Sequence, residues 1–162
     1  MKHLLSFNEN LNPRPYLSIS RYVEIRDYIH DVSQDIKDEG FSIFNYRNLD
    51  NNGNIANFSI EFRNIFYEGI STSKINNFKW EDIKDTVNHL ISYINEETNN
   101  KFTVQIEYTK PNESREGMSC TLNEFLKRVD WLGSINRLSL TFLNKSSKTN
   151  IGNSMNSRKI IP

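Results

Sequence analysis

The segment NLDNNGNI, residues 48–55, has residue types and spacing that could begin a calcium-binding loop. Asn48 and Asp50 occupy the first and third positions of an EF-hand loop, and Gly53 occupies the sixth. The twelfth position, where the loop needs a bidentate Glu, is Ser59, so a single carboxylate would face the ion. Asn-Gly between alternating hydrophobic segments favours a hairpin turn. The sequence therefore predicts a turn, with no metal site and no cofactor.

The histidines and the single cysteine form no recognisable catalytic or zinc-binding pattern. His30 and His89 fall in two different predicted helices, and Cys120 has no local signature of a nucleophile. The six glycines are isolated, so the chain has no glycine-rich phosphate-binding loop. Since no nucleophile, base and orienting group can be assembled from these residues, we expect no enzymatic activity.

Composition indicates one small globular domain. The chain has 162 residues, of which 36% are hydrophobic, and its ten Phe, seven Tyr and two Trp supply large side chains for one core. One cysteine excludes a disulfide scaffold and is compatible with a reducing compartment. No apolar segment approaches the ~18 residues of a membrane span. The chain contains 23 asparagines and one alanine, a composition typical of an AT-rich genome.

Two long helices and a short third helix are predicted. The first spans about 20–38, with Ser20 as its N-cap and a stripe of isoleucines and valine facing the core. The second spans about 79–97 and has a similar stripe. Thr121 and Glu124 form the capping box of the short helix, which ends at Gly133.

Four segments are predicted strands: FSIFNYRN, ANFSIEFRNIF, KFTVQIEY and NRLSLTF. Phe58, Ile60 and Phe62 alternate with polar residues in the second. The predicted fold class is α+β: a two-layer sandwich with an antiparallel or mixed sheet of about four strands and both long helices on one face.

The two helix-strand segments resemble each other. When VEIRDYIHDVSQDIK is placed over WEDIKDTVNHLISYIN, Ile25 matches Ile83 and Ile36 matches Ile94. Two α-β-β halves, the second with an inserted helix, would explain the match. Two unrelated amphipathic helices could also produce it.

Charged residues gather on the first helix and near the C-terminus. Five acidic residues, three or four positions apart, form an acidic ridge beside the apolar stripe: Glu24, Asp27, Asp31, Asp35 and Asp38. The segment 144–162 has four basic residues and no acidic one: Lys145, Lys148, Arg158 and Lys159. The ridge is either a solvated helix face or a docking surface for a basic partner.

Three regions follow from this pattern. Residues 1–17 are predicted to be an N-terminal peptide with a stiff spacer at Pro13 and Pro15, residues 18–143 one α+β domain, and residues 144–162 a disordered basic tail. Without the tail, 16 basic residues stand against 20 acidic ones. Separated charges of opposite sign favour oriented association with another macromolecule.

Aromatic residues of the first predicted strand offer an alternative. Phe41 and Ile43 occupy one face of that strand, and Phe44 and Tyr46 occupy the other. Exposed aromatic side chains on a sheet can stack on bases, as in proteins that bind single-stranded RNA. Together with the basic tail, they would make a single-stranded nucleic-acid-binding module.

The N-terminal MKHLLSFNEN resembles the start of small accessory proteins of large tailed bacteriophages, T-even-like and crAss-like. Met1, Lys2, Leu4, Leu5, Phe7 and Glu9 match the pattern of basic, apolar, aromatic and acidic residues. In the T-even internal head proteins such a peptide targets the capsid and is removed after a glutamate. The chain departs from that pattern because it has no aliphatic residue two positions before Glu9.

These observations lead to one expectation. The chain is predicted to be a non-enzymatic phage accessory protein that binds another macromolecule, with a protein as the expected partner. It would act either as a virion component or as a host-takeover factor in the host cytoplasm. The ridge residues and the basic residues of the tail are the expected partner-binding positions.

Overall fold

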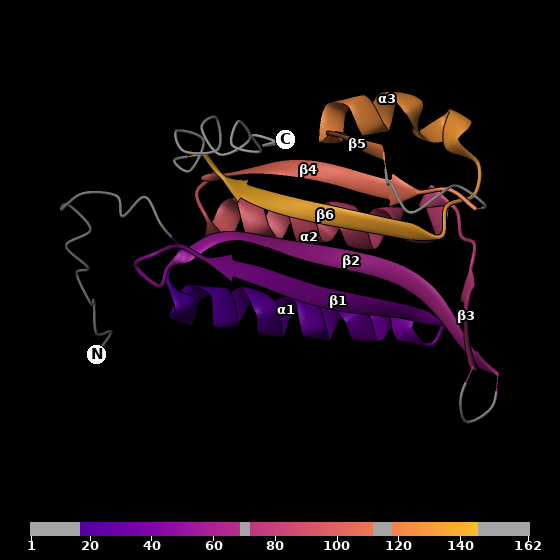
Figure 1. Cartoon of the computed structure of the whole chain (residues 1–162), viewed down its shortest axis with the longest axis horizontal. Coiled ribbons are helices and arrows are strands. Elements are labelled where there is room, and N and C mark those ends of the chain that lie inside the picture. The colour runs from indigo at the N-terminus through magenta and orange to yellow at the C-terminus, as the bar shows by residue number, and fades with distance from the viewer. Residues whose placement is uncertain (1–16, 69–71, 112–117, 146–162) are drawn as a thin grey trace, which may run out of the picture.

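A computed structural model of the chain describes residues 17–68, 72–111 and 118–145. This part is α+β, with three helices and a six-stranded antiparallel sheet (Figure 1). The helices are α1 (Ile19–Lys37), α2 (Lys84–Glu97) and α3 (Leu122–Leu132). The strands are β1 (Phe41–Leu49), β2 (Ile55–Glu68), β3 (Thr72–Asn76), β4 (Phe102–Thr109), β5 (Met118–Thr121) and β6 (Arg137–Asn144).

The strands lie in the order β1-β2-β6-β4-β5, and β3 pairs with the far end of β2. Every pairing is antiparallel, so β1 forms one edge of the sheet and the four-residue β5 forms the other. The predicted count of about four strands was wrong. No strand was predicted over β3 or β5, because five and four residues are too few to show a period-two pattern.

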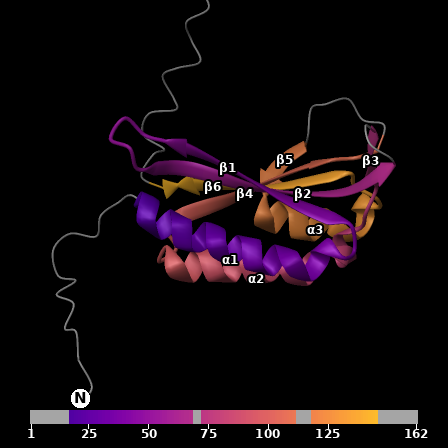
Figure 2. The same cartoon turned by 90° about the horizontal axis from the view of Figure 1, so that it is seen from below.

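Apolar side chains of the sheet point toward the helices. Phe58, Ile60 and Phe62 of β2 are at most 1% exposed, as the alternation predicted. Figure 2 shows α1 and α2 side by side along the same side of the sheet, with α3 nearer β4 and β5. This arrangement buries the apolar side chains of the strands and helices in one continuous core.

The helix boundaries differ slightly from the prediction. Ser18, rather than Ser20, is the N-cap of α1, because its side chain accepts a hydrogen bond from the Arg21 N–H. The second helix begins later than predicted, since residues Trp80–Asp82 form a separate 3₁₀ turn. The capping box of α3 between Thr121 and Glu124 is confirmed, and Gly133 ends that helix with φ +65°.

The order of elements agrees with the proposed internal repeat. A helix is followed by two paired strands in each half, α1-β1-β2 and α2-β4-β6, and the β5-α3 segment is the insertion. The matched residues Ile25 and Ile83 are both buried, as are Ile36 and Ile94. β2 and β6 pair at the centre, so the two halves share one sheet.

Within the stretch 48–55, residues 50–54 form the turn between β1 and β2. The Asp50 carboxylate accepts hydrogen bonds from the Asn52 N–H at 2.8 Å and the Asn54 N–H at 2.9 Å. Gly53 has φ +78°, a backbone conformation that glycine adopts without steric cost. These backbone hydrogen bonds, the one from Asn54 first, lower the pKa of Asp50 below its ordinary value of 3.8. The carboxylate therefore organises the turn.

The folded domain extends beyond both of its predicted boundaries, residues 18 and 143. Leu17, assigned to the N-terminal spacer, is buried and its carbonyl accepts a hydrogen bond from the Ile55 N–H. Asn144, assigned to the tail, is the last residue of β6 and is buried, and Lys145 bonds through its backbone to Lys101. The rest of the predicted N-terminal peptide and tail lies outside the described residues. Within the described ranges, no helix has the length and apolar character needed to cross a membrane.

Replacing Asp50 tests the turn. Asp50→Ala removes both acceptor bonds, so its melting temperature at pH 7 should be lower than that of the wild type. Since folding lowers this pKa, the stabilisation is present above 3.8 and is lost as the pH falls through the folded-state value. The gap between the two melting temperatures should therefore close at low pH. Millimolar calcium should change neither temperature; a rise for the wild type alone would show a calcium site.

Phe58 tests the buried face of the sheet. Its ring stacks on Phe142 with centroids 4.7 Å apart and meets Tyr22 edge-on at 5.4 Å. Phe58→Ala should lower the free energy of unfolding by about 3–5 kcal/mol, measured by urea denaturation. Tyr46→Ala, a matched aromatic truncation on the other face, should cost less than about 0.5 kcal/mol. Equal losses would contradict the one-sided core.

Candidate functional site: the open face and outer edge of the sheet

The second face of the sheet carries no helix among the described elements (Figure 2). The register places polar and charged side chains there: Ser42, Asn57, Ser59, Glu61, Arg63, Arg137, Ser139, Thr141, Gln105 and Glu107, with Phe44 and Tyr46 from β1. We call this surface the open face. Ser59 and Thr141 join across β2 and β6 by a hydrogen bond of 3.0 Å between their hydroxyl oxygens.

A row of alternating charges crosses the open face. Glu61 is only 7% exposed and pairs with Arg63 on its own strand. Arg137 of β6 lies 3.9 Å from the second oxygen of Glu61 and also pairs with Glu107 of β4. Two arginines and two glutamates make this row neutral, and each of its charged side chains forms an ion pair with another member of the row.

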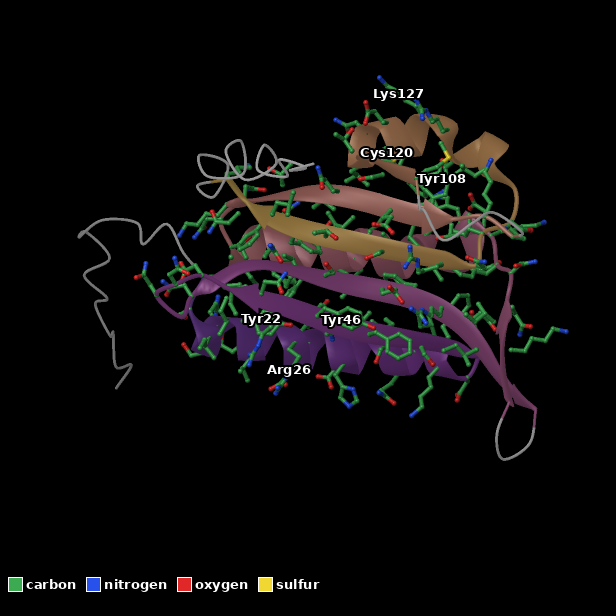
Figure 3. All side chains as sticks on the ribbon, viewed as in Figure 1. Tyr22, Arg26, Tyr46, Tyr108, Cys120 and Lys127 are labelled. Carbon is green, nitrogen blue, oxygen red and sulfur yellow. The ribbon has the colours of Figure 1, made fainter. Side chains whose placement is uncertain are left out.

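The two aromatic side chains of the open face differ in how accessible they are to a ligand. The Arg63 guanidinium lies 5.4 Å from the centroid of the Phe44 ring, in a cation–π contact. Tyr46 is 53% exposed and labelled on β1 in Figure 3. One exposed ring beside a neutral charge row is a weak platform for stacked bases, which need several rings and a basic groove.

The outer edge of β1 is the clearest incomplete feature of the sheet. The Ile65 N–H donates to the Gly40 carbonyl at 3.0 Å, which makes Gly40 and Ile65 a hydrogen-bonded pair. Bonded and non-bonded pairs alternate in antiparallel strands, so Ser42, Phe44 and Tyr46 bond to β2. The N–H and C=O groups of the intervening residues point away from β2: Phe41, Ile43, Asn45 and Arg47. Among the described strands, β2 is the sole partner of β1.

The edge has few of the features that block further strand pairing. Proteins protect edges with proline, lysine, bulges or very short strands. β1 has nine residues, no proline and no lysine, and its one irregularity lies at its end, between Asn48 and Leu49. Arg47 is the one charged residue of the strand. The first six residues of β1 therefore form a regular and uncharged edge.

A cavity of about 380 Å³ lies between α1 and this edge. From α1 it is lined by Arg26, Asp27, Ile29, His30 and Ser33, and from β1 by Ile43 and Asn45. The amide oxygen Oδ1 of Asn45 is buried and accepts no hydrogen bond. A buried acceptor without a donor costs roughly 1–3 kcal/mol. A rotation of the Asn45 side chain toward the cavity would let a bound donor satisfy this oxygen.

The acidic ridge borders the cavity. All five of its residues are exposed, and Asp27 contributes directly to the cavity wall. Asp27 pairs with the Arg26 Nη2 at 2.8 Å, and Glu24 pairs with Arg21, which also reaches Glu97 of α2. Including Asp38, its C-cap, α1 has five acidic and three basic residues. The helix is thus net acidic along the edge strand.

The basic positions predicted for partner binding lie elsewhere. The Lys145 ammonium donates to the Asn100 carbonyl at 2.5 Å, in the turn before β4. The other three, Lys148, Arg158 and Lys159, lie outside the described residues. The ridge and Lys145 do not meet in one site.

The histidines and cysteine are also separated. The His89 Nε2 forms a hydrogen bond of 2.9 Å with the Tyr28 hydroxyl, and His30 contacts Gln34 of its own helix. Cys120 lies on β5 opposite Ile106, and burial raises the pKa of its thiol. Within the described part of the chain, no hydrogen bond joins either histidine to this cysteine, and no three His, Cys, Asp or Glu side chains gather in a way that could hold a metal ion.

Comparison of the chain with protein-family models, curated proteins and solved structures finds no match in any of the three. The candidate site therefore rests on geometry. Sequence reasoning identified the ridge but missed the edge and the cavity, because which strand lies at an edge depends on pairing between distant segments.

Glu61 tests the charge row on the open face. Glu61→Ala leaves two arginines without their shared partner, so the free energy of unfolding should fall by about 1–3 kcal/mol in urea denaturation. The matched Glu107→Ala removes a more exposed carboxylate, whose side chain is 43% accessible, and should cost less than about 1 kcal/mol. Equal losses would mean that burial of Glu61 contributes nothing.

Proposed function

We propose that the protein is a non-enzymatic accessory protein of a tailed bacteriophage and that it acts by binding another protein. The observation that carries the proposal is the regular, unpaired edge of β1 beside the net acidic α1. Main-chain groups at an open edge give affinity for another chain, and neighbouring pockets give specificity. The phage origin rests on the resemblance of the N-terminal peptide.

The proposal takes the fold as a two-layer sandwich, with the helices on one face and the other face and one edge accessible to a partner. Two settings are compatible with it. As a virion component, the protein would be present in purified particles; as a host-takeover factor, it would act in the host cytoplasm and be absent from them.

The nucleic-acid alternative has less support. Tyr46 favours it, because an exposed ring on a sheet can stack on a base. Glu61 and Glu107 weigh against it, because carboxylates within the charge row would repel phosphates. A nucleic-acid role would appear as binding that weakens steeply with salt.

A tagged pull-down from nuclease-treated lysates of infected cells tests the proposal. The full-length protein and a form ending at Lys145 should both retain the same protein, because the edge and α1 are intact in both. The shortened form ends there because Asn144 is buried in β6. The proposal fails if neither form retains a protein while the chain turns over a small molecule or binds single-stranded nucleic acid.

A further inference from the structure

The outer edge of β1 and the α1 cavity form one composite site. The outward N–H and C=O groups belong to the residues whose side chains face the helices, and Ile43 and Asn45 also line the cavity. A strand added to this edge would lie about 4.8 Å beyond β1. Every second side chain of that strand would point toward α1 and could enter the cavity.

We propose that this site binds an extended, basic peptide segment of a partner protein, which adds to the sheet as a further strand beside β1. The inference rests on the proposed function and names its partner class and its surface. Backbone hydrogen bonds to Phe41, Ile43, Asn45 and Arg47 hold the segment, and a Lys or Arg side chain of the segment occupies the cavity.

The chemistry of the cavity selects a basic side chain. The buried Asn45 Oδ1 lacks a donor, and the Asp27 carboxylate supplies negative charge at the wall. Ile43, which is partly exposed, offers apolar surface for the methylene groups that precede an ammonium or guanidinium. Arg26 now pairs with Asp27, but both side chains are at least half exposed, so exchanging this pair for the ligand costs little.

A second copy of the chain is a poorer occupant of the edge. Figure 1 shows α1 running along β1 and projecting beyond its outer side, and Figure 3 labels Arg26 on that projecting side. Paired strands are about 4.8 Å apart, whereas packed helices need 8–10 Å between their axes. Two copies joined at β1 would force their α1 helices together, while a peptide without a helix can lie beside β1, over the part of α1 that projects beyond it.

The first test uses two synthetic ten-residue probes, alternating Arg-Thr and alternating Glu-Thr, and fluorescence anisotropy. The Arg-Thr peptide should bind at least tenfold more tightly. N-methylation of alternate residues then distinguishes strand addition from attraction of charges, because only every second N–H of an added strand faces β1. Methylating one alternating set should abolish binding and methylating the other should not. Equal effects of both sets would overturn the inference.

The second test uses variants of the full chain. Asp27→Lys should weaken binding of the Arg-Thr peptide at least tenfold, and Ser33→Trp, which fills the cavity, should weaken it similarly. Asp85→Lys makes the same charge change at an exposed position of α2 and should alter binding less than twofold. Circular dichroism checks that each variant is folded. Equal losses for Asp27→Lys and Asp85→Lys would reduce the effect to net charge and overturn the inference.

Two further outcomes would assign the edge to another occupant. Removal of residues 146–162 should leave peptide affinity unchanged; a tenfold gain would show that the chain's own basic segment occupies the edge. Sedimentation should give a monomer; a dimer lost on Asp27→Lys would assign the site to a second copy. A partner that the pull-down retains equally with wild type and Asp27→Lys would overturn this inference and leave the proposed function intact.

Discussion

One-sided burial of the sheet is the constraint on which the rest of the structure depends. Every second side chain is apolar and almost fully excluded from solvent along β4 and in the paired central parts of β2 (residues 58–62) and β6 (residues 138–142). At about 25 cal/mol per Å² of apolar surface, covering this face is the main source of stability. The helices must therefore lie on that side. Because they do, the other face and the first edge strand remain for other roles.

The open face and the outer edge differ in whether their polar groups have partners. On the open face, polar side chains satisfy one another: Glu61 with two arginines, and Ser59 with Thr141. At the outer edge, backbone groups of β1 and the buried Asn45 oxygen have no partner among the described residues. A surface that satisfies itself gains little from a ligand. An incomplete one gains hydrogen bonds, which is why the account places binding at the edge.

The parts of the fold that the sequence predicted are those encoded locally. The alternation around Phe58, the apolar stripe of α1 and the capping box of Thr121 each follow from neighbouring residues. The missed parts depend on distant partners. β3 and β5 are too short to show a pattern, and the edge position of β1 follows from the central pairing of β2 with β6. The ridge could be read from spacing, but the cavity beside it required α1 and β1 in place.

Hydrogen exchange of the β1 amides, followed residue by residue by NMR, tests the central claim that this edge is open. In the free protein the N–H groups of Ser42, Phe44 and Tyr46, which bond to β2, should exchange slowly, and those of Ile43 and Asn45 should exchange fast. A bound strand should protect the second set and leave the first unchanged. Slow exchange of both sets in the free protein would show that the edge is already covered and would contradict the account.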